Sequence, residues 1–171
     1  MNKIYIGIGG VCGLLTSFFL YYYLNNELYH SKQHNLLYRV SSVSVLFVSV
    51  LFAIIAAKKL NGNRISFMRC MFTGFVISLI SGLVNFGFFT GIYFAKPEIL
   101  NKAEQVSISQ YLSMPENKDK SEKELRDVKR QIHSQFTPGG SLLPTVFASF
   151  ATCMIAAIFI SAFVYTRSYP Q

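Results

Sequence analysis

Residues 71–95 read MFTGFVISLISGLVNFGFFTGIYFA, an apolar run without a charged side chain. A hydrocarbon core about 30 Å thick needs ~20 helical residues to span it, so this run is long enough to cross a bilayer. Three further apolar runs occupy residues 4–24, 36–57 and 142–165, and none carries an Asp, Glu or Lys well inside it. The sequence therefore predicts an all-α membrane protein with four transmembrane helices. Residues 1–171 are expected to form a single membrane domain.

The basic residues are unevenly distributed among the connections between these runs, although the net charge of the chain is +8. Six of them gather at the two ends and in one loop: Lys3, Lys58, Lys59, Arg64, Arg69 and Arg167. Cytoplasmic loops carry an excess of Lys and Arg. We therefore predict that both termini and residues 58–69 are cytoplasmic, and that residues 25–39 and 96–141 lie on the outer face. This clustering favours a membrane orientation signal over a nucleic-acid partner.

The connection 96–141 is the one long segment outside the predicted spans. Pro97 suits a first helical turn, and residues 97–114 are compatible with a helix that ends at the Pro115–Asp119 stretch. Ser121 and Glu124 form a capping-box pattern for a second helix. Four apolar residues then recur at spacings of 3, 4 and 4: Leu125, Val128, Ile132 and Phe136. We expect a helical hairpin whose stripe covers the membrane helices, lies in the headgroups, or binds a partner.

Small residues recur every fourth position in the apolar runs, where they favour close approach of helix backbones. The first run carries Gly9 and Gly13, and the third carries Gly74, Ser78 and Gly82. We expect Gly82 to be the point of closest approach on the third helix. Such stripes serve packing within one bundle or an interface with another subunit.

Candidate chemistry is sparse. Asn85 is the one strongly polar side chain near the middle of a span, where it is expected to bond a Ser of the second helix or to line a polar path. His30 and His34 are four residues apart, with Glu27 nearby, which is a weak pattern for a metal site because zinc needs three or four protein ligands. We therefore expect no metal, no cofactor and no catalytic residues.

Two short stretches also carry a family resemblance: Gly62-Asn63-Arg64-Ile65-Ser66-Phe67 and Gly74-Phe75-Val76-Ile77-Ser78-Leu79-Ile80. In these the chain resembles the domain-of-unknown-function family 4199, and the resemblance continues through Tyr93 and Pro97 to the last helix. It covers most of the chain, best from residue 58 onward. The resemblance implies an inner-membrane protein with four helices, of a kind found mainly in Bacteroidota. It implies no activity, because the family has no established function.

Two functions are compatible with these patterns. The first is a non-enzymatic accessory or scaffold subunit that binds another membrane protein, an envelope component or a second copy of the chain, and its support is the packing stripes and the outer hairpin. The alternative is a small transporter or lipid-handling protein that uses a groove around Asn85 and the Ser-rich second run, with Ser41, Ser42, Ser44 and Ser49. An enzyme is not expected. The lipid bilayer is a partner under either hypothesis.

Overall fold

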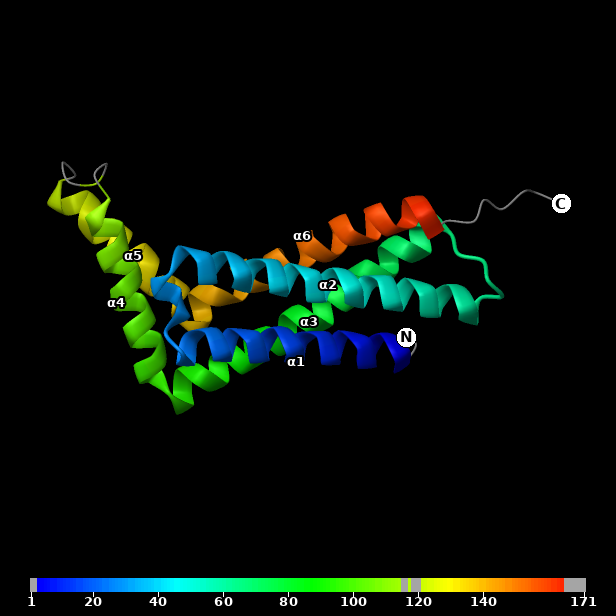
Figure 1. Ribbon diagram of the computed structural model, residues 1–171, viewed down its shortest axis with the longest axis horizontal. Coiled ribbons are helices and arrows are strands. Elements are labelled where there is room, and N and C mark those ends of the chain that lie inside the picture. Colours follow the sequence, from blue (N-terminus) through cyan, green and yellow to red (C-terminus); the bar gives the residue numbers. More distant parts are fainter. Residues whose placement is uncertain (1–2, 115–116, 118–120, 165–171) are drawn as a thin grey trace.

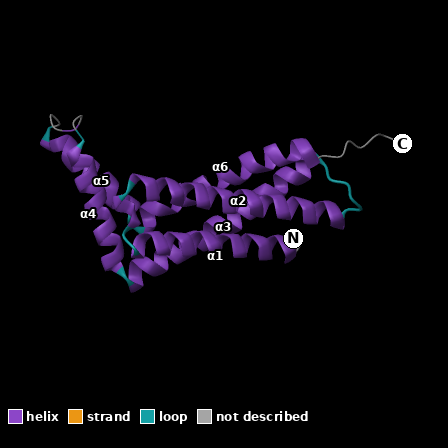
Figure 2. Ribbon diagram, viewed as in Figure 1, coloured by secondary structure: helices purple, strands orange, loops and turns teal. Residues whose placement is uncertain are grey.

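The computed structural model describes residues 3–114, 117 and 121–164, and throughout them the regular structure is helical. Figures 1 and 2 show its elements: α1 (Lys3–Asn25), the 3-10 helix η1 (Leu28–His30), α2 (Lys32–Leu60), α3 (Phe67–Ala95), α4 (Pro97–Ser113), α5 (Glu122–Gln135) and α6 (Pro138–Val164). Four of them are long and apolar enough to cross a membrane, namely α1, α2, α3 and α6. The four predicted spans are thus confirmed as helices, while Tyr165 and Arg167 lie outside the described residues.

All four membrane helices begin before their apolar runs, at Lys3, Lys32, Phe67 and Pro138. Ser66 caps α3, and its hydroxyl accepts a hydrogen bond from the backbone N–H of Arg69 at 3.3 Å. Pro138 is the first residue of α6, a position that needs no backbone N–H. The second helix starts at Lys32 and not at Leu36, so Arg39, which the sequence analysis placed in a connection, lies inside α2.

The four long helices run side by side, and the α4–α5 hairpin crosses one end of them (Figure 1). The start of α1, the turn between α2 and α3, and the end of α6 lie together at the opposite end. Helix α3 packs along both α1 and α6, and α2 completes the group by contacting α1 and α6. We call the half of the bundle next to α4 and α5 the hairpin-side half.

Small side chains fill the centre of the bundle, and large apolar side chains cover its outside. Cys12, Ala53, Ile77 and Cys153 are fully buried in the main core cluster. Large apolar side chains are instead exposed around α1, α2, α3 and α6, up to 79% for Phe163. Water-soluble monomers rarely expose contiguous apolar surface of this extent. The arrangement therefore suits helices that are surrounded by lipid.

Glycines set the closest helix contacts. A Cβ added at Gly9 would lie 2.9 Å from Ile80 Cβ, and one at Gly13 would lie 2.6 Å from Val84 Cβ, so α1 and α3 meet along this stripe. On α3, an added Cβ at Gly74 would lie 2.7 Å from Ala157 Cβ of α6, whereas one at Gly82 would lie 3.3 Å from the nearest atom. The prediction that Gly82 marks the closest approach of α3 is therefore wrong.

The reason lies in the facing residue on α6. At Gly74 both the Ala157 side chain and the Cys153 backbone oxygen of α6 stand opposite, at 2.7 and 3.1 Å from an added Cβ, whereas at Gly82 the nearest atom is the backbone Cα of Val146 at 3.3 Å. Ser78, between the two glycines, is buried, and its hydroxyl donates to the carbonyl oxygen of Phe75 at 2.7 Å. Spacing in the sequence identifies the stripe, but the angle between the helices decides where along it they touch.

The segment between α3 and α6 forms the expected helical hairpin. Ser121 and Glu124 make both hydrogen bonds of the capping box at the start of α5. On α4, Leu100 and Ala103 are buried in a second cluster with Tyr23 of α1 and Tyr29 of η1. Most of the predicted Pro115–Asp119 break lies outside the described residues. Its Asn117 is described and donates to the carbonyl oxygen of Tyr111 at 2.8 Å.

Polar contacts also join the hairpin to the bundle. The Lys102 ammonium lies 3.0 Å from the Glu27 carboxylate, and this pairing lowers the pKa of Glu27 and raises that of Lys102. His133 of α5 contacts the Glu104 carboxylate of α4 at 2.9 Å. Because these pairs are solvent-exposed, the buried apolar cluster is expected to contribute more to docking than the charges do.

Candidate functional site: a polar cavity in the bundle

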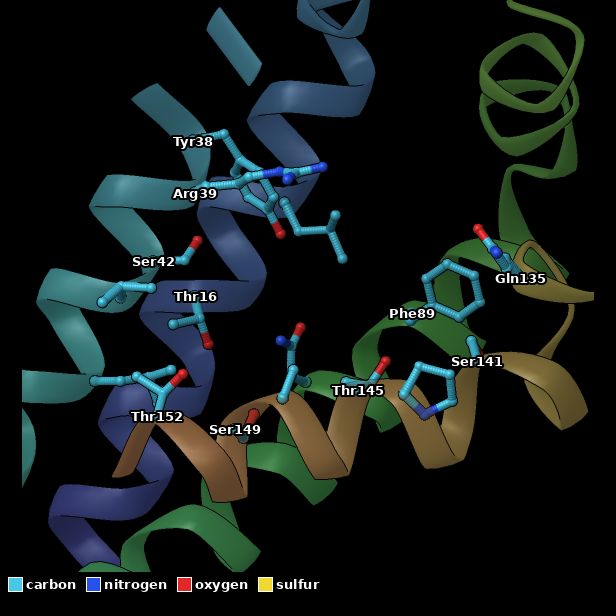
Figure 3. A pocket seen from close by; sticks show the side chains of 16 residues that line it. Thr16, Tyr38, Arg39, Ser42, Phe89, Gln135, Ser141, Thr145, Ser149 and Thr152 are labelled. Carbon is cyan, nitrogen blue, oxygen red and sulfur yellow. The ribbon is translucent and has the colours of Figure 1, made fainter. Parts of the chain in front are cut away.

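A cavity of about 670 Å³ lies in the hairpin-side half, between α2 and α6. Its size falls within the range of ~300–1,000 Å³ that is typical of small-molecule sites. Figure 3 shows side chains from five helices converging on it. The lining residues are Thr16, Leu20, Tyr38, Arg39, Ser42, Val43, Leu46, Asn85, Phe89, Gln135, Ser141, Pro144, Thr145, Ala148, Ser149 and Thr152.

The floor of the cavity is formed by buried, mostly polar side chains. Thr16 of α1 and Ser141 and Ser149 of α6 are at most 6% exposed. The Thr16 hydroxyl donates to the Gly13 carbonyl oxygen at 3.0 Å, and the Ser141 hydroxyl donates to the Pro138 carbonyl oxygen at 3.3 Å. Donation to the helix backbone satisfies these hydroxyl protons, while their oxygens keep lone pairs for a ligand.

Asn85 of α3 lies on the wall of this cavity. Its carbonyl oxygen lies 3.3 Å from the Ser17 hydroxyl of α1 and shares the proton of that hydroxyl with the Gly13 carbonyl oxygen, which is closer at 2.7 Å. The predicted helix–helix bond therefore forms, but with α1 and not with the second helix. Because the Asn85 oxygen faces Ser17, its amide nitrogen is available as a donor toward the cavity. Asn85 therefore both contacts a neighbouring helix and lines the cavity.

The cavity opens sideways between α2 and α6. Arg39 and Val43 on α2, and Pro144 and Ala148 on α6, line it and are themselves exposed. The buried residues of the floor lie deeper, toward α1 and α3. Because α2 and α6 are both candidate membrane spans, the opening between them faces lipid when the bundle is in a bilayer.

The opening exists because α2 is held at its two ends more tightly than between them. Toward the far end of the bundle, Val50, Ala53, Ile54 and Ala57 are fully buried. At the hairpin side, the Tyr38 ring stacks on Tyr23 with centroids 4.6 Å apart. Between these points the facing side chains, Ser42 on α2 and Thr145, Ala148 and Ser149 on α6, are small and leave the space unfilled.

Sequence reasoning found Asn85 and Ser42 but missed most of this cavity. Of the four serines singled out on the second helix, Ser42 lines it, while Ser44 and Ser49 face an apolar groove between α1 and α2. Arg39 was missed because it was assigned to the connection 25–39, although the apolar run 36–57 also contains it. An ionisable residue in a membrane segment is by default a candidate functional residue. That rule could have identified Arg39 from the sequence alone.

The other candidates do not join this cavity as a group. Leu125, Val128 and Ile132 are half-buried on α5. Phe136, the residue that follows α5, is also half-buried and packs against the cluster that docks the hairpin. His30 lies in η1 and His34 in α2, on either side of the Ser31 break, so they do not share a face of one helix. Among the described residues, no group of three or more His, Cys, Asp or Glu side chains could hold a metal ion.

The cavity lining carries side-chain nitrogen donors and no acid. It contains one guanidinium, two side-chain amides and several hydroxyls, but no Asp or Glu. Such a set suits a ligand that carries hydrogen-bond acceptors. Apolar residues such as Leu20, Leu46 and Phe89 complete the walls. A site of this kind, open to lipid, can hold the polar end of an amphiphile.

Comparison with known proteins adds a family but no activity. No curated protein and no solved structure matches the chain. One family model, described as "Protein of unknown function (DUF4199)", matches residues 5–166, which is nearly the whole chain and includes all of the cavity lining. The expected resemblance is therefore confirmed. The chain belongs to the DUF4199 family.

Proposed function

We propose that this protein is a non-enzymatic, lipid-handling protein of the bacterial inner membrane, and that it binds the polar end of an amphiphile in the cavity between α2 and α6. The single observation that carries the proposal is the lateral opening of a polar-floored cavity between two membrane helices. A water-soluble ligand would have to cross lipid to enter by this route. An amphiphile reaches it by diffusion within the membrane.

The lining supports ligand binding over simple packing. Bundle interfaces in membranes place small residues in close contact, as at Gly13 and Gly74. Between α2 and α6 the small side chains instead surround a volume of about 670 Å³. Burying polar groups in an apolar phase without partners is costly, so such a space is expected to be occupied by water or a polar ligand.

A matched pair of substitutions on α6 tests the proposal. Ala148→Phe places a large ring at the rim of the cavity, and Ala162→Phe places the same ring on an exposed position at the other end of the helix. We expect Ala148→Phe to reduce the amount of lipid that co-purifies with the protein several-fold, because the ring blocks entry. Native mass spectrometry of protein released from detergent measures the bound lipid.

Equal lipid retention by wild type, Ala148→Phe and Ala162→Phe would contradict lipid binding in the cavity. Both substituted positions are exposed, so neither variant is expected to unfold the bundle. A thermal melt of each variant in the same detergent checks that expectation.

The orientation we propose is cytoplasmic for both termini and the α2–α3 turn, and periplasmic for α4 and α5. Its support is the clustering of Lys and Arg near residues 58–69. A cysteine at the exposed Lys123 should react with an impermeant thiol reagent in intact spheroplasts, and one at the exposed Arg64 should not. Cys12, Cys70 and Cys153 are fully buried and should add little background. Labelling of the Arg64 position alone would reverse the orientation.

An accessory subunit is the second candidate. The observation that favours it is the exposed charged face of α5, formed by Lys123, Arg126, Asp127, Lys129 and Arg130. The apolar stripe is half-buried toward the hairpin, so the charged face is the surface that α5 offers to a partner. Affinity purification from native membranes discriminates the two functions, because a stoichiometric protein partner favours the accessory role and a bound lipid favours the first proposal.

A further inference from the structure

We infer that the amphiphile is a phosphate-bearing anionic lipid, and that Arg39 binds its headgroup. The inference rests on the proposed function, since it names the ligand class of the same cavity. Its starting point is the placement of a single cation at the rim of a cavity whose lining has side-chain nitrogen donors and no acid. Figure 3 shows the Arg39 side chain extending from α2 over this cavity.

Arg39 makes neither a hydrogen bond nor a salt bridge within the part of the chain that the structure describes. Two other basic side chains near this end are paired: Lys96 donates to the Tyr21 hydroxyl at 2.8 Å, and Lys102 pairs with Glu27 at 3.0 Å. A guanidinium has five N–H donors in a planar fork that matches a phosphate or carboxylate. At the edge of an apolar phase, an anion is the partner that satisfies it.

The other lining residues also favour an anionic ligand deeper in the cavity. The amide nitrogens of Asn85 and Gln135 and the hydroxyls of Thr145 and Thr152 belong to it, and no carboxylate opposes an anion. Donors at several depths suit a headgroup that carries its charge at the rim and further acceptor oxygens below it. A phosphodiester with an esterified polyol has this distribution of acceptors.

Depth in the membrane favours a lipid over a soluble phosphate. Arg39 lies seven residues after Lys32, the start of α2, which is about 10 Å along the helix at 1.5 Å per residue. This places it close to the boundary between headgroups and hydrocarbon. Next to it, the rim residues Val43, Pro144 and Ala148 are exposed and apolar, so acyl chains can leave the cavity between α2 and α6.

The test measures lipid affinity of the full-length protein by native mass spectrometry, with phosphatidylglycerol as the anionic probe and phosphatidylethanolamine as the zwitterionic one. Wild type is expected to prefer phosphatidylglycerol. Arg39→Gln should weaken phosphatidylglycerol binding about tenfold or more, as the loss of a charge-assisted contact implies. It should weaken phosphatidylethanolamine binding less, because the ammonium group of that lipid offsets the charge of its phosphate. The affinity of Arg39→Lys for phosphatidylglycerol should lie between those of wild type and Arg39→Gln. Arg64→Gln, which removes an exposed cation at the far end, is the control.

Each other outcome overturns a defined step. If wild type binds both lipids equally and Ala148→Phe weakens both, lipid binding stands and the anionic headgroup is wrong. If Arg39→Gln and Arg64→Gln weaken phosphatidylglycerol equally, the effect is one of general charge and Arg39 is not the headgroup residue. If inorganic phosphate at millimolar concentration displaces the lipid, the ligand is a soluble phosphate. If Ala148→Phe changes nothing, the proposed function itself fails.

Discussion

Replacing Gly13 with alanine is expected to lower the free energy of unfolding in detergent by about 1–3 kcal/mol, the usual effect of overpacking a closely packed site. The added Cβ would lie 2.6 Å from Val84 Cβ and 3.0 Å from the backbone oxygen of Ser81. Because backbone and Cβ atoms cannot rotate away, α1 and α3 must move apart. The midpoint of thermal unfolding, followed by circular dichroism, measures the loss.

Gly10→Ala is the matched control on the same helix. A Cβ at Gly10 would meet no atom within 4 Å, so only the higher helix propensity of alanine acts, and it acts in the stabilising direction. Equal unfolding midpoints for Gly13→Ala and Gly10→Ala would contradict a tight α1–α3 contact at this position.

The second large effect is expected at the corner between α5 and α6. A Cβ at Gly140 would lie 2.0 Å from the backbone carbonyl oxygen of Ser134, far inside van der Waals contact. Gly140→Ala must therefore displace the end of α5 from the start of α6. We expect faster amide hydrogen exchange across residues 122–135 and loss of the His133–Glu104 contact, because both depend on this corner.

Gly139→Ala supplies the comparison, since a Cβ there would meet nothing within 4 Å. It should leave hydrogen exchange of α5 as in wild type. The corner also carries Gln135 and Ser141 of the cavity lining, so Gly140→Ala is further expected to weaken lipid retention. Unchanged exchange in Gly140→Ala would mean that α5 and α6 do not pack as described.

The features that were read correctly from the sequence depend on neighbours along the chain. The four spans follow from composition over ~20 residues, because an apolar helix of that length is the stable state in a bilayer. The capping box of Ser121 and Glu124 forms because its atoms lie within one helical turn.

The features that were missed depend on how helices cross. Spacing identifies the stripe of Gly74, Ser78 and Gly82, but the facing residues of α6 decide that Gly74 is the tighter contact. The same holds for Asn85, whose partner proved to be Ser17 of α1. Many helix faces can supply a hydroxyl to an amide in the membrane, and one sequence does not choose among them.

What the sequence by itself determined is therefore the class of protein, its four apolar helices, the hairpin between the last two of them, and the local signals that start and end each element. Only the tertiary structure decided that side chains from five helices surround one cavity, that it opens between α2 and α6, and that Arg39 stands at its rim. The physical reason is the distance along the chain between the residues that interact. Helix formation and membrane insertion are governed by residues within a turn or a span, whereas a cavity is the volume that helices distant in sequence fail to fill.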